Sequence, residues 1–234
     1  MEIQIWSDIA CPWCWVGKKH IEIALADFDP EVRVVWRAFE LNPQAPTTSS
    51  GPVDYAQRLA DKYRMGRRDA QDFIDRMTQA GRDVGVDMRF DRIRPCNTFN
   101  AHRLLAWAHA LGDRGALKEH LFAAYLSEGR DLNDAGTLGQ LVSEAGLDGE
   151  QAVKVLADGS FGDEVRGDQA EAQRLGITGV PFFVFGRGLT ASGAQPPAVL
   201  RRALIEALSR HAAESSSSST DASSPRACGV DGCD

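Results

Sequence analysis

The sequence predicts an α/β domain that is interrupted by a long, all-helical insertion. The first 41 residues read as strand, helix and strand, a long stretch of purely helical periodicity follows, and a strongly apolar strand pattern returns at 179–186. A chain of 234 residues with 43% hydrophobic content can bury a core of its own without disulfide bonds. Its five cysteines are therefore more informative about chemistry than about scaffolding.

The N-terminal segment predicts one β-α-β unit. Polar and apolar residues alternate at 2–7, as they do in a half-buried strand. The motif Cys-Pro-Trp-Cys occupies 11–14, and apolar residues then recur at helical spacing as far as Phe28. The nearly continuous apolar run at 32–41 is typical of a strand that is covered on both faces. The helix of this unit should begin at the two cysteines.

Only helical patterns follow for the next part of the chain. A segment rich in Pro, Thr, Ser and Gly at 42–51 reads as a linker. Apolar stripes at helical spacing then predict helices near 52–66, 73–84, 98–111, 117–124 and 138–145. No strand-like alternation of useful length separates these stripes, so we expect them to form a helical subdomain.

Strand character returns after this subdomain. A predicted helix at 163–175 is followed by Gly-Val-Pro and the apolar strand, which can pair with 189–192 as a hairpin. Pro196 and Pro197 then open a last helix with an apolar face. We divide the chain into a first part of the α/β domain, a helical insertion, a second part of the α/β domain and a flexible serine-rich tail, at 1–50, 51–161, 162–213 and 214–234.

The charge and the hydropathy pattern exclude several classes of partner. A net charge of −7 without a clustered basic run argues against nucleic acid and against an anionic membrane surface. No stretch approaches the roughly 20 apolar residues that a membrane helix needs, and the N-terminus lacks a signal-peptide pattern. We therefore expect a cytoplasmic protein, in which a close cysteine pair is usually redox-active or metal-binding.

Cys11 and Cys14 form the predicted redox centre. Residues three apart on a helix are close enough for a disulfide bond, and Pro12 fits the first helical position because it lacks an N–H group. The free N–H groups and the positive dipole end of the helix stabilise a thiolate, so Cys11 should ionise more readily than a free cysteine and attack first. Cys14, one turn deeper, should resolve the mixed disulfide.

Half of a zinc site is the alternative interpretation of this pair. Cys228 and Cys233 in the tail could complete a set of four thiolate ligands. The first pair, however, lies between a strand and a helix with bulky Pro12 and Trp13 inside it, and the second pair lies on a polar tail. We therefore expect a redox pair and no metal.

These elements and four motifs resemble the DsbA family of thioredoxin-fold oxidoreductases and look closest to its FrnE-type branch. The motifs are Ser-Asp-Ile-Ala-Cys-Pro-Trp-Cys at 7–14, Asn-Thr-Phe-Asn-Ala-His-Arg-Leu-Leu at 97–105, Gly-Val-Pro-Phe-Phe at 179–183 and Ser-Gly-Ala-Gln at 192–195. The resemblance covers about residues 1 to 210. It implies a thioredoxin-like fold with a helical insertion. It also implies a cis peptide between Val180 and Pro181 that faces the cysteines, with Val180, Pro181, Pro12 and Trp13 contacting an extended substrate.

The same superfamily includes kappa-class transferases and 2-hydroxychromene-2-carboxylate isomerases, which depend on glutathione. This chain resembles them in Asn97 and Thr98 and in its insertion, but they typically carry serine where it has Cys11. Asn97 and Thr98 also have a simple explanation as the cap of the predicted helix at 98–111. Three further residues, which we interpret as structural or incidental, are Cys96, His20 and His102.

The sequence thus predicts a thiol–disulfide oxidoreductase, with reductase, oxidase or isomerase activity on protein or small-molecule disulfides. No bound cofactor is expected, although glutathione or a thioredoxin-type reductant could serve as electron partner. Cys228 and Cys233 are candidates for an auxiliary redox couple that exchanges electrons with Cys11 and Cys14 within one chain or across a homodimer, the alternative being an idle tail. The alternative functions are a glutathione-dependent transferase or isomerase and a redox-linked chaperone.

Overall fold

The structure is a computed structural model that describes residues 1–48, 51–113, 115–186 and 188–217. A four-stranded sheet with the order β2-β1-β3-β4 forms its centre. The central strand β1 (Glu2–Ser7) pairs in parallel with β2 (Arg33–Ala38) and antiparallel with β3 (Phe182–Phe185). β4 (Leu189–Ser192) completes the sheet by pairing with β3 as a hairpin. The predicted α/β fold is confirmed, although β2 is shorter than the predicted strand at 32–41.

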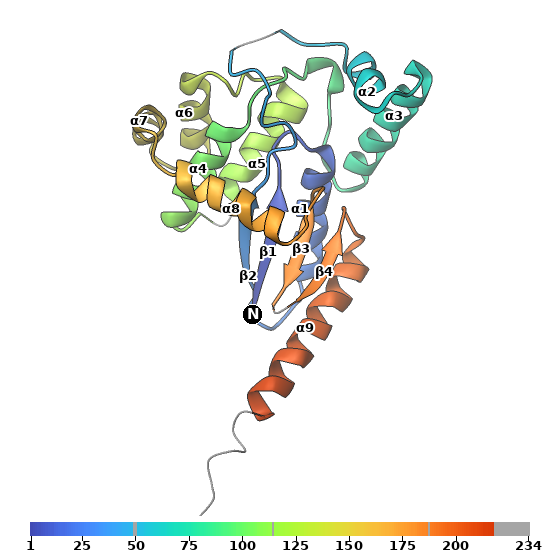
Figure 1. The fold of residues 1–234 in the computed structure, drawn as a ribbon, viewed down its shortest axis with the longest axis vertical. Helices are drawn as coiled ribbons and strands as arrows, with labels where there is room; N and C mark the ends of the chain where they lie inside the picture. The colour runs from blue at the N-terminus through green and yellow to red at the C-terminus, as the bar shows by residue number, and fades with distance from the viewer. Residues whose placement is uncertain (49–50, 114, 187, 218–234) are drawn as a thin grey trace, which may run out of the picture.

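Helices cover both faces of this sheet (Figure 1). On one face, α1 (Pro12–Leu25) and α9 (Pro197–Ser217) pack on Ile3 and Ile5, which alternate along β1 with residues of the other face. On that other face, α8 (Gly162–Arg174) packs on Trp6 through Ala172. The period-two pattern of β1 therefore buries apolar side chains on both sides of the sheet.

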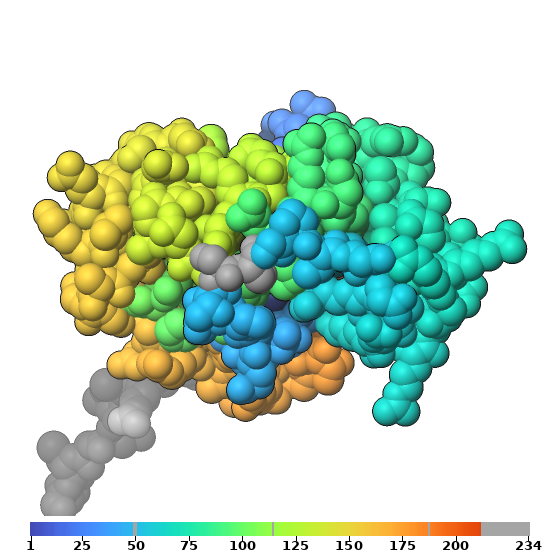
Figure 2. Space-filling model, turned by 90° about the horizontal axis from the view of Figure 1, so that it is seen from above, coloured from blue at the N-terminus to red at the C-terminus, as the bar shows by residue number. Residues whose placement is uncertain are grey.

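The helical insertion lies beyond one end of the sheet (Figure 1). It contains helices α2 to α7, a short 3₁₀ helix η1 and a π-helical turn η2. Their bounds are Tyr55–Tyr63 for α2, Arg67–Asp83 for α3, Phe90–Arg92 for η1, Phe99–Ala110 for α4, Ala116–Ala123 for α5, Ala124–Glu128 for η2, Ala135–Glu144 for α6 and Gly149–Asp158 for α7. Seen from above, in Figure 2, the segment that follows β2 crosses between the α2–α3 side and the α4–α7 side.

Helices α7 and α9 also differ from the sequence prediction. Helix α7 was not predicted, because only Ala152 and Val155 of its ten residues are buried and they leave a weak stripe. Helix α9 continues to Ser217, whereas the sequence placed the start of the tail at 214. Extending a formed helix adds one hydrogen bond for each residue fixed, so a moderate helix former such as serine can prolong it.

The remaining tail, with Cys228 and Cys233, lies outside the described residues. Among the helices of the described residues, none is both long enough and apolar enough to cross a membrane.

Candidate active site

Cys11 and Cys14 lie at the start of α1, at the end of the sheet that faces the insertion. Cys11 is the N-cap residue of the helix, and Pro12 takes the first helical position. The Cys14 N–H donates to the Cys11 carbonyl oxygen at 3.0 Å, which closes the first turn and brings the two residues together. Cys11 is 5% exposed and Cys14 is fully buried. Only the first sulfur is therefore near the surface.

The loop before β3 faces the Cys11 sulfur. The Val180–Pro181 peptide bond is cis, and the Cys11 thiol donates to the Val180 carbonyl oxygen at 3.6 Å. Helix α1 passes close to the same loop, because a Cβ atom at Gly17 would lie 2.9 Å from the Pro181 ring. The absence of a side chain at position 17 lets the loop approach α1 closely enough to place Val180 beside Cys11.

The Cys14 thiol is held in its protonated form. Burial raises the pKa of Cys14 well above its ordinary value, and the hydrogen bond and charge of Cys11 raise it further. A backbone hydrogen bond from Asp8 opposes this shift, while the Asp8 charge adds to it. Cys14 therefore carries little thiolate at neutral pH and is a poor nucleophile in this state.

A buried pair formed by Asp8 and His102 lies behind the cysteines. His102 Nε2 is 3.4 Å from Asp8 Oδ1, and both side chains are 1% exposed. Burial would raise the pKa of Asp8, but the neighbouring His102 and the Leu41 N–H outweigh it, so that this pKa is below its usual value. β2 ends at Ala38, opposite the last residue of β1, and the Leu41 N–H that follows donates to Asp8 Oδ2 at 2.7 Å.

Lys118 is a second charged residue in the interior near this site. It is 1% exposed, and its ammonium group lies 4.7 Å from the centre of the Trp36 ring and 5.5 Å from that of Phe122. Among the described residues, no carboxylate lies within ion-pair distance of it. Burial lowers the pKa of Lys118 to about 8, against the opposing charges of Cys14 and Asp8.

Helix α5, which carries Lys118, is joined to α1 by the neighbouring Glu119. Its carboxylate accepts a hydrogen bond from Trp15 Nε1 at 3.0 Å and lies 2.6 Å from the ammonium nitrogens of both Lys18 and Lys19. Lys118 and His102 also line one small cavity of about 20 Å³. The insertion thus contributes two buried polar residues next to the cysteine-bearing helix.

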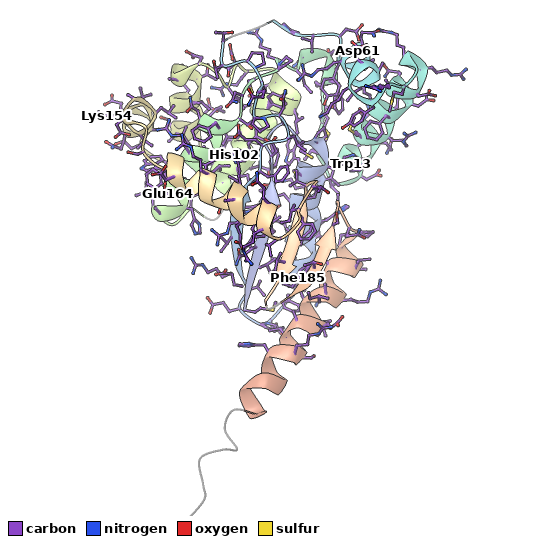
Figure 3. The ribbon with its side chains drawn as sticks, viewed as in Figure 1. Trp13, Asp61, His102, Lys154, Glu164 and Phe185 are labelled. Atoms are coloured by element: carbon purple, nitrogen blue, oxygen red, sulfur yellow. The ribbon has the colours of Figure 1, made fainter. Side chains whose placement is uncertain are left out.

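Cys11 opens into a cavity of about 130 Å³ between the α/β domain and the insertion. Pro12, Trp13 and Cys96 line it too, and Figure 3 shows Trp13 at the N-terminal end of α1. Burial raises the pKa of Cys96 to about 12, so Cys96 is an unreactive thiol at neutral pH. This agrees with its interpretation as a structural residue.

The structure brings six of the residues singled out in the sequence to one place. Cys11 and Cys14 lie in the first turn of α1 with Pro12 and Trp13, and the Val180–Pro181 loop faces them. The helix cap differs in detail from the expectation, because the Asn97 side chain accepts from the Phe99 N–H at 2.9 Å whereas Thr98 makes no side-chain cap bond.

Sequence reasoning missed the partners of the histidines and the buried lysine. His102 faces Asp8, and His20 Nδ1 lies 2.9 Å from the Gln195 carbonyl oxygen. Neither partner could be recognised from the sequence alone. Lys118 has a weak sequence signal, because it adjoins Leu117 and lies three and four residues before Leu121 and Phe122 in a largely apolar helix.

Comparisons with known proteins agree with this geometry. The family model of the DSBA-like thioredoxin domain matches residues 2–205. The crystal structure of a probable DsbA oxidoreductase, SCO1869 from Streptomyces coelicolor, is 38% identical with a TM-score of 0.83, and the match covers 100% of this chain and 98% of that one. The uncharacterized protein YwbO of Bacillus subtilis (strain 168) is 28% identical over 188 residues, which are 80% of this chain and 87% of YwbO.

A more distant similarity shows the fold alone. The structure of a 2-hydroxychromene-2-carboxylate isomerase has a TM-score of 0.62 at 13% identity, over 94% of this chain and 100% of that one. The family match, by contrast, spans both parts of the α/β domain and the whole insertion. The chain therefore belongs to the DSBA-like thioredoxin domain family of oxidoreductases.

Proposed function

We propose that this protein is a thiol–disulfide oxidoreductase that acts through Cys11 and Cys14. The observation that carries the proposal is the position of the Cys11 sulfur at a helix N-terminus and 3.6 Å from the Val180 carbonyl oxygen, with a second thiol buried one turn below it. A helix N-terminus favours a thiolate, and the adjacent Val180–Pro181 backbone offers polar groups to an extended substrate. The family assignment supports redox chemistry in general.

The proposed reduction transfers two electrons from the dithiol to the substrate. The Cys11 thiolate attacks one sulfur of a substrate disulfide, so that a mixed disulfide forms and one substrate thiolate leaves. Cys14 then loses its proton and attacks the Cys11 sulfur, which forms the Cys11–Cys14 disulfide and releases the second substrate thiolate. The released thiolates take up protons, and the reverse sequence oxidises a substrate dithiol.

The electrostatics of the site favour this order of events. The Cys11 charge is one of the causes that raise the pKa of Cys14, and that charge disappears when Cys11 enters the mixed disulfide. The positive charge of Lys118 also favours the Cys14 thiolate. Cys14 therefore becomes easier to deprotonate at the stage that requires its attack.

We expect the reduced protein to cleave insulin disulfides catalytically when dithiothreitol is supplied, and its dithiol to titrate as a two-electron couple in glutathione redox buffers. Insulin precipitation and mass spectrometry after thiol alkylation measure the two properties. A protein whose residue 11 and 14 thiols show no reversible two-electron exchange would contradict the proposed function.

We also propose that Cys228 and Cys233 act as an auxiliary couple for this site. The proposal is supported by their spacing and by Gly229 and Gly232, which allow the tight loop that a disulfide between them needs. We expect Cys228→Ser with Cys233→Ser to slow re-reduction of the Cys11–Cys14 disulfide by an external thiol such as glutathione. Unchanged turnover and an unchanged redox state of Cys11 in the double variant would show that the tail pair is idle.

A further inference from the structure

More cationic than acidic side chains line the cavity beside Cys11. Two of its lining residues, Arg58 and Lys62, are cationic. One lining residue, Asp8, is acidic, and its carboxylate is already engaged by His102 and by backbone N–H groups. The cavity next to the candidate reactive sulfur is therefore positive, in a chain whose net charge is −7.

Helix α2 directs this charge toward the cavity. Tyr55, Arg58 and Lys62 are spaced at i, i+3 and i+7, so they share one face of the helix. All three line the cavity, and the Lys62 ammonium lies 5.4 Å from the centre of the neighbouring Tyr63 ring. The face of α2 that carries two cations is thus the face that borders the space in front of Cys11.

The charge of Arg58 affects the pKa values of other groups that line this cavity. Burial raises the pKa of Tyr55, the charge of Cys11 raises it further, and the Arg58 guanidinium opposes both. Arg58 likewise opposes the increases in the pKa of Cys96 and of Tyr125, which line the same cavity. Arg58 therefore lies within electrostatic range of the groups around Cys11.

Neither cation is neutralised by an ion pair among the described residues. Nearby acidic groups on the helix have other partners, since Asp54 pairs with Arg67 at 2.7 Å and Asp61 accepts from Gln57 at 2.8 Å. A surface cation beside a reactive centre attracts an anionic substrate and accelerates its association. The unpaired charges on α2 are available for a substrate rather than for the fold.

We propose that Arg58 and Lys62 select disulfides that carry a carboxylate close to the sulfur, an inference that rests on the proposed oxidoreductase function. The carboxylate lies against the α2 cations while one substrate sulfur meets Cys11. The cavity of about 130 Å³ admits a group of side-chain size, which suits a small organic disulfide or an acidic residue next to a cystine.

Three small disulfides with the same two-carbon spacer between the sulfur and the end group test this inference. 3,3′-Dithiodipropionate, 2-hydroxyethyl disulfide and cystamine differ mainly in carrying negative, neutral and positive end groups. The reduced protein is mixed with each one, and the loss of its dithiol is followed by rapid alkylation and mass spectrometry, so that each disulfide consumes one enzyme dithiol and no other reductant is required. Rate constants are divided by those for dithiothreitol with the same disulfide, which corrects for intrinsic reactivity.

The variant Arg58→Glu with Lys62→Glu is compared with Arg68→Glu with Lys154→Glu. The second pair changes the net charge equally and lies at exposed positions that do not line this cavity. We expect the α2 variant to lower the ratio of the dithiodipropionate rate constant to that of hydroxyethyl disulfide by about tenfold, and to raise the cystamine ratio. The decrease in the dithiodipropionate ratio should become smaller as salt is added, because salt screens the charges. The control pair should leave both ratios within about twofold.

The outcomes separate this inference from the proposed function. Ratios that respond equally to both pairs of substitutions would overturn the selection by Arg58 and Lys62 while leaving the oxidoreductase activity in place. A native protein that reduces none of the three disulfides would contradict the proposed function itself. Peptides with an acidic or a basic residue beside a cystine, assayed in the same way, distinguish a protein substrate from a small molecule.

Discussion

Cys14→Ala is expected to stop the reaction after its first step and to leave the substrate covalently attached to Cys11. Cys14 is fully buried one turn below Cys11, so it is positioned to displace whatever Cys11 captures. Alanine at this position keeps an apolar side chain of smaller size in the core and removes the only thiol in that turn able to resolve the intermediate. Mass spectrometry under non-reducing conditions should show one substrate thiol added for each protein chain.

Cys11→Ser should lower the rate of disulfide reduction by about three orders of magnitude or more, because no thiolate remains to form the covalent intermediate. The control is the double variant Cys11→Ser with Cys14→Ala, which retains Cys96, Cys228 and Cys233 and should form no adduct. An adduct in that double variant would show that another cysteine is the first nucleophile. Glutathione-dependent turnover that survives in Cys11→Ser would indicate a transferase or isomerase instead.

Lys118→Met is expected to stabilise the protein, with an increase of about 2–3 kcal/mol in the free energy of unfolding at pH 7. The native ammonium group is almost completely buried without an ion-pair partner among the described residues, and methionine has a similar length without a charge. The thioether can still pack on the Trp36 and Phe122 rings. Urea denaturation measures the difference, and Lys154→Met, at an exposed position on α7 marked in Figure 3, is the control.

The stabilisation by Lys118→Met should decrease as the pH rises. The pKa of Lys118 is lowered from 10.5 to about 8 in the folded protein, so below pH 8 both states are protonated and folding buries the full charge. Between pH 8 and pH 10.5 the folded state loses the proton while the unfolded state keeps it, and native stability rises with pH. The difference between variant and native protein should therefore shrink across this window. A difference that stays constant through it would show that the lysine is not desolvated.

The sequence predicted the framework of the site because local patterns determine it. The alternation at 2–7 and the proline after Cys11 are sufficient to place a helix start at the end of a strand. The hairpin after the Val-Pro pair was equally recognisable from its glycines and its apolar strand. These features depend on residues that are close together in the chain.

The features that were missed depend on contacts between distant segments. Asp8 meets His102, which is 94 positions later, and no spacing rule connects the end of a strand with the second turn of a helix in an insertion. Lys118 is followed in its helix by the polar residues Glu119 and His120, and only the packing of α5 beside α1 shows that its charge is buried. Helix α7 was missed because a helix on the surface needs few buried residues, and its apolar stripe is too short to be recognised in the sequence.

The close approach at Gly17 couples the spacing of the backbone to the chemistry of the cysteines. A methyl group there would meet the Pro181 ring at 2.9 Å, so either the helix or the loop would have to move. Any such movement changes the distance between the Cys11 sulfur and the Val180 carbonyl oxygen, although Gly17 itself touches neither atom of that contact. A substitution at position 17 that adds no charge and removes no thiol should therefore slow the proposed disulfide exchange, only because it shifts the Val180–Pro181 loop relative to Cys11.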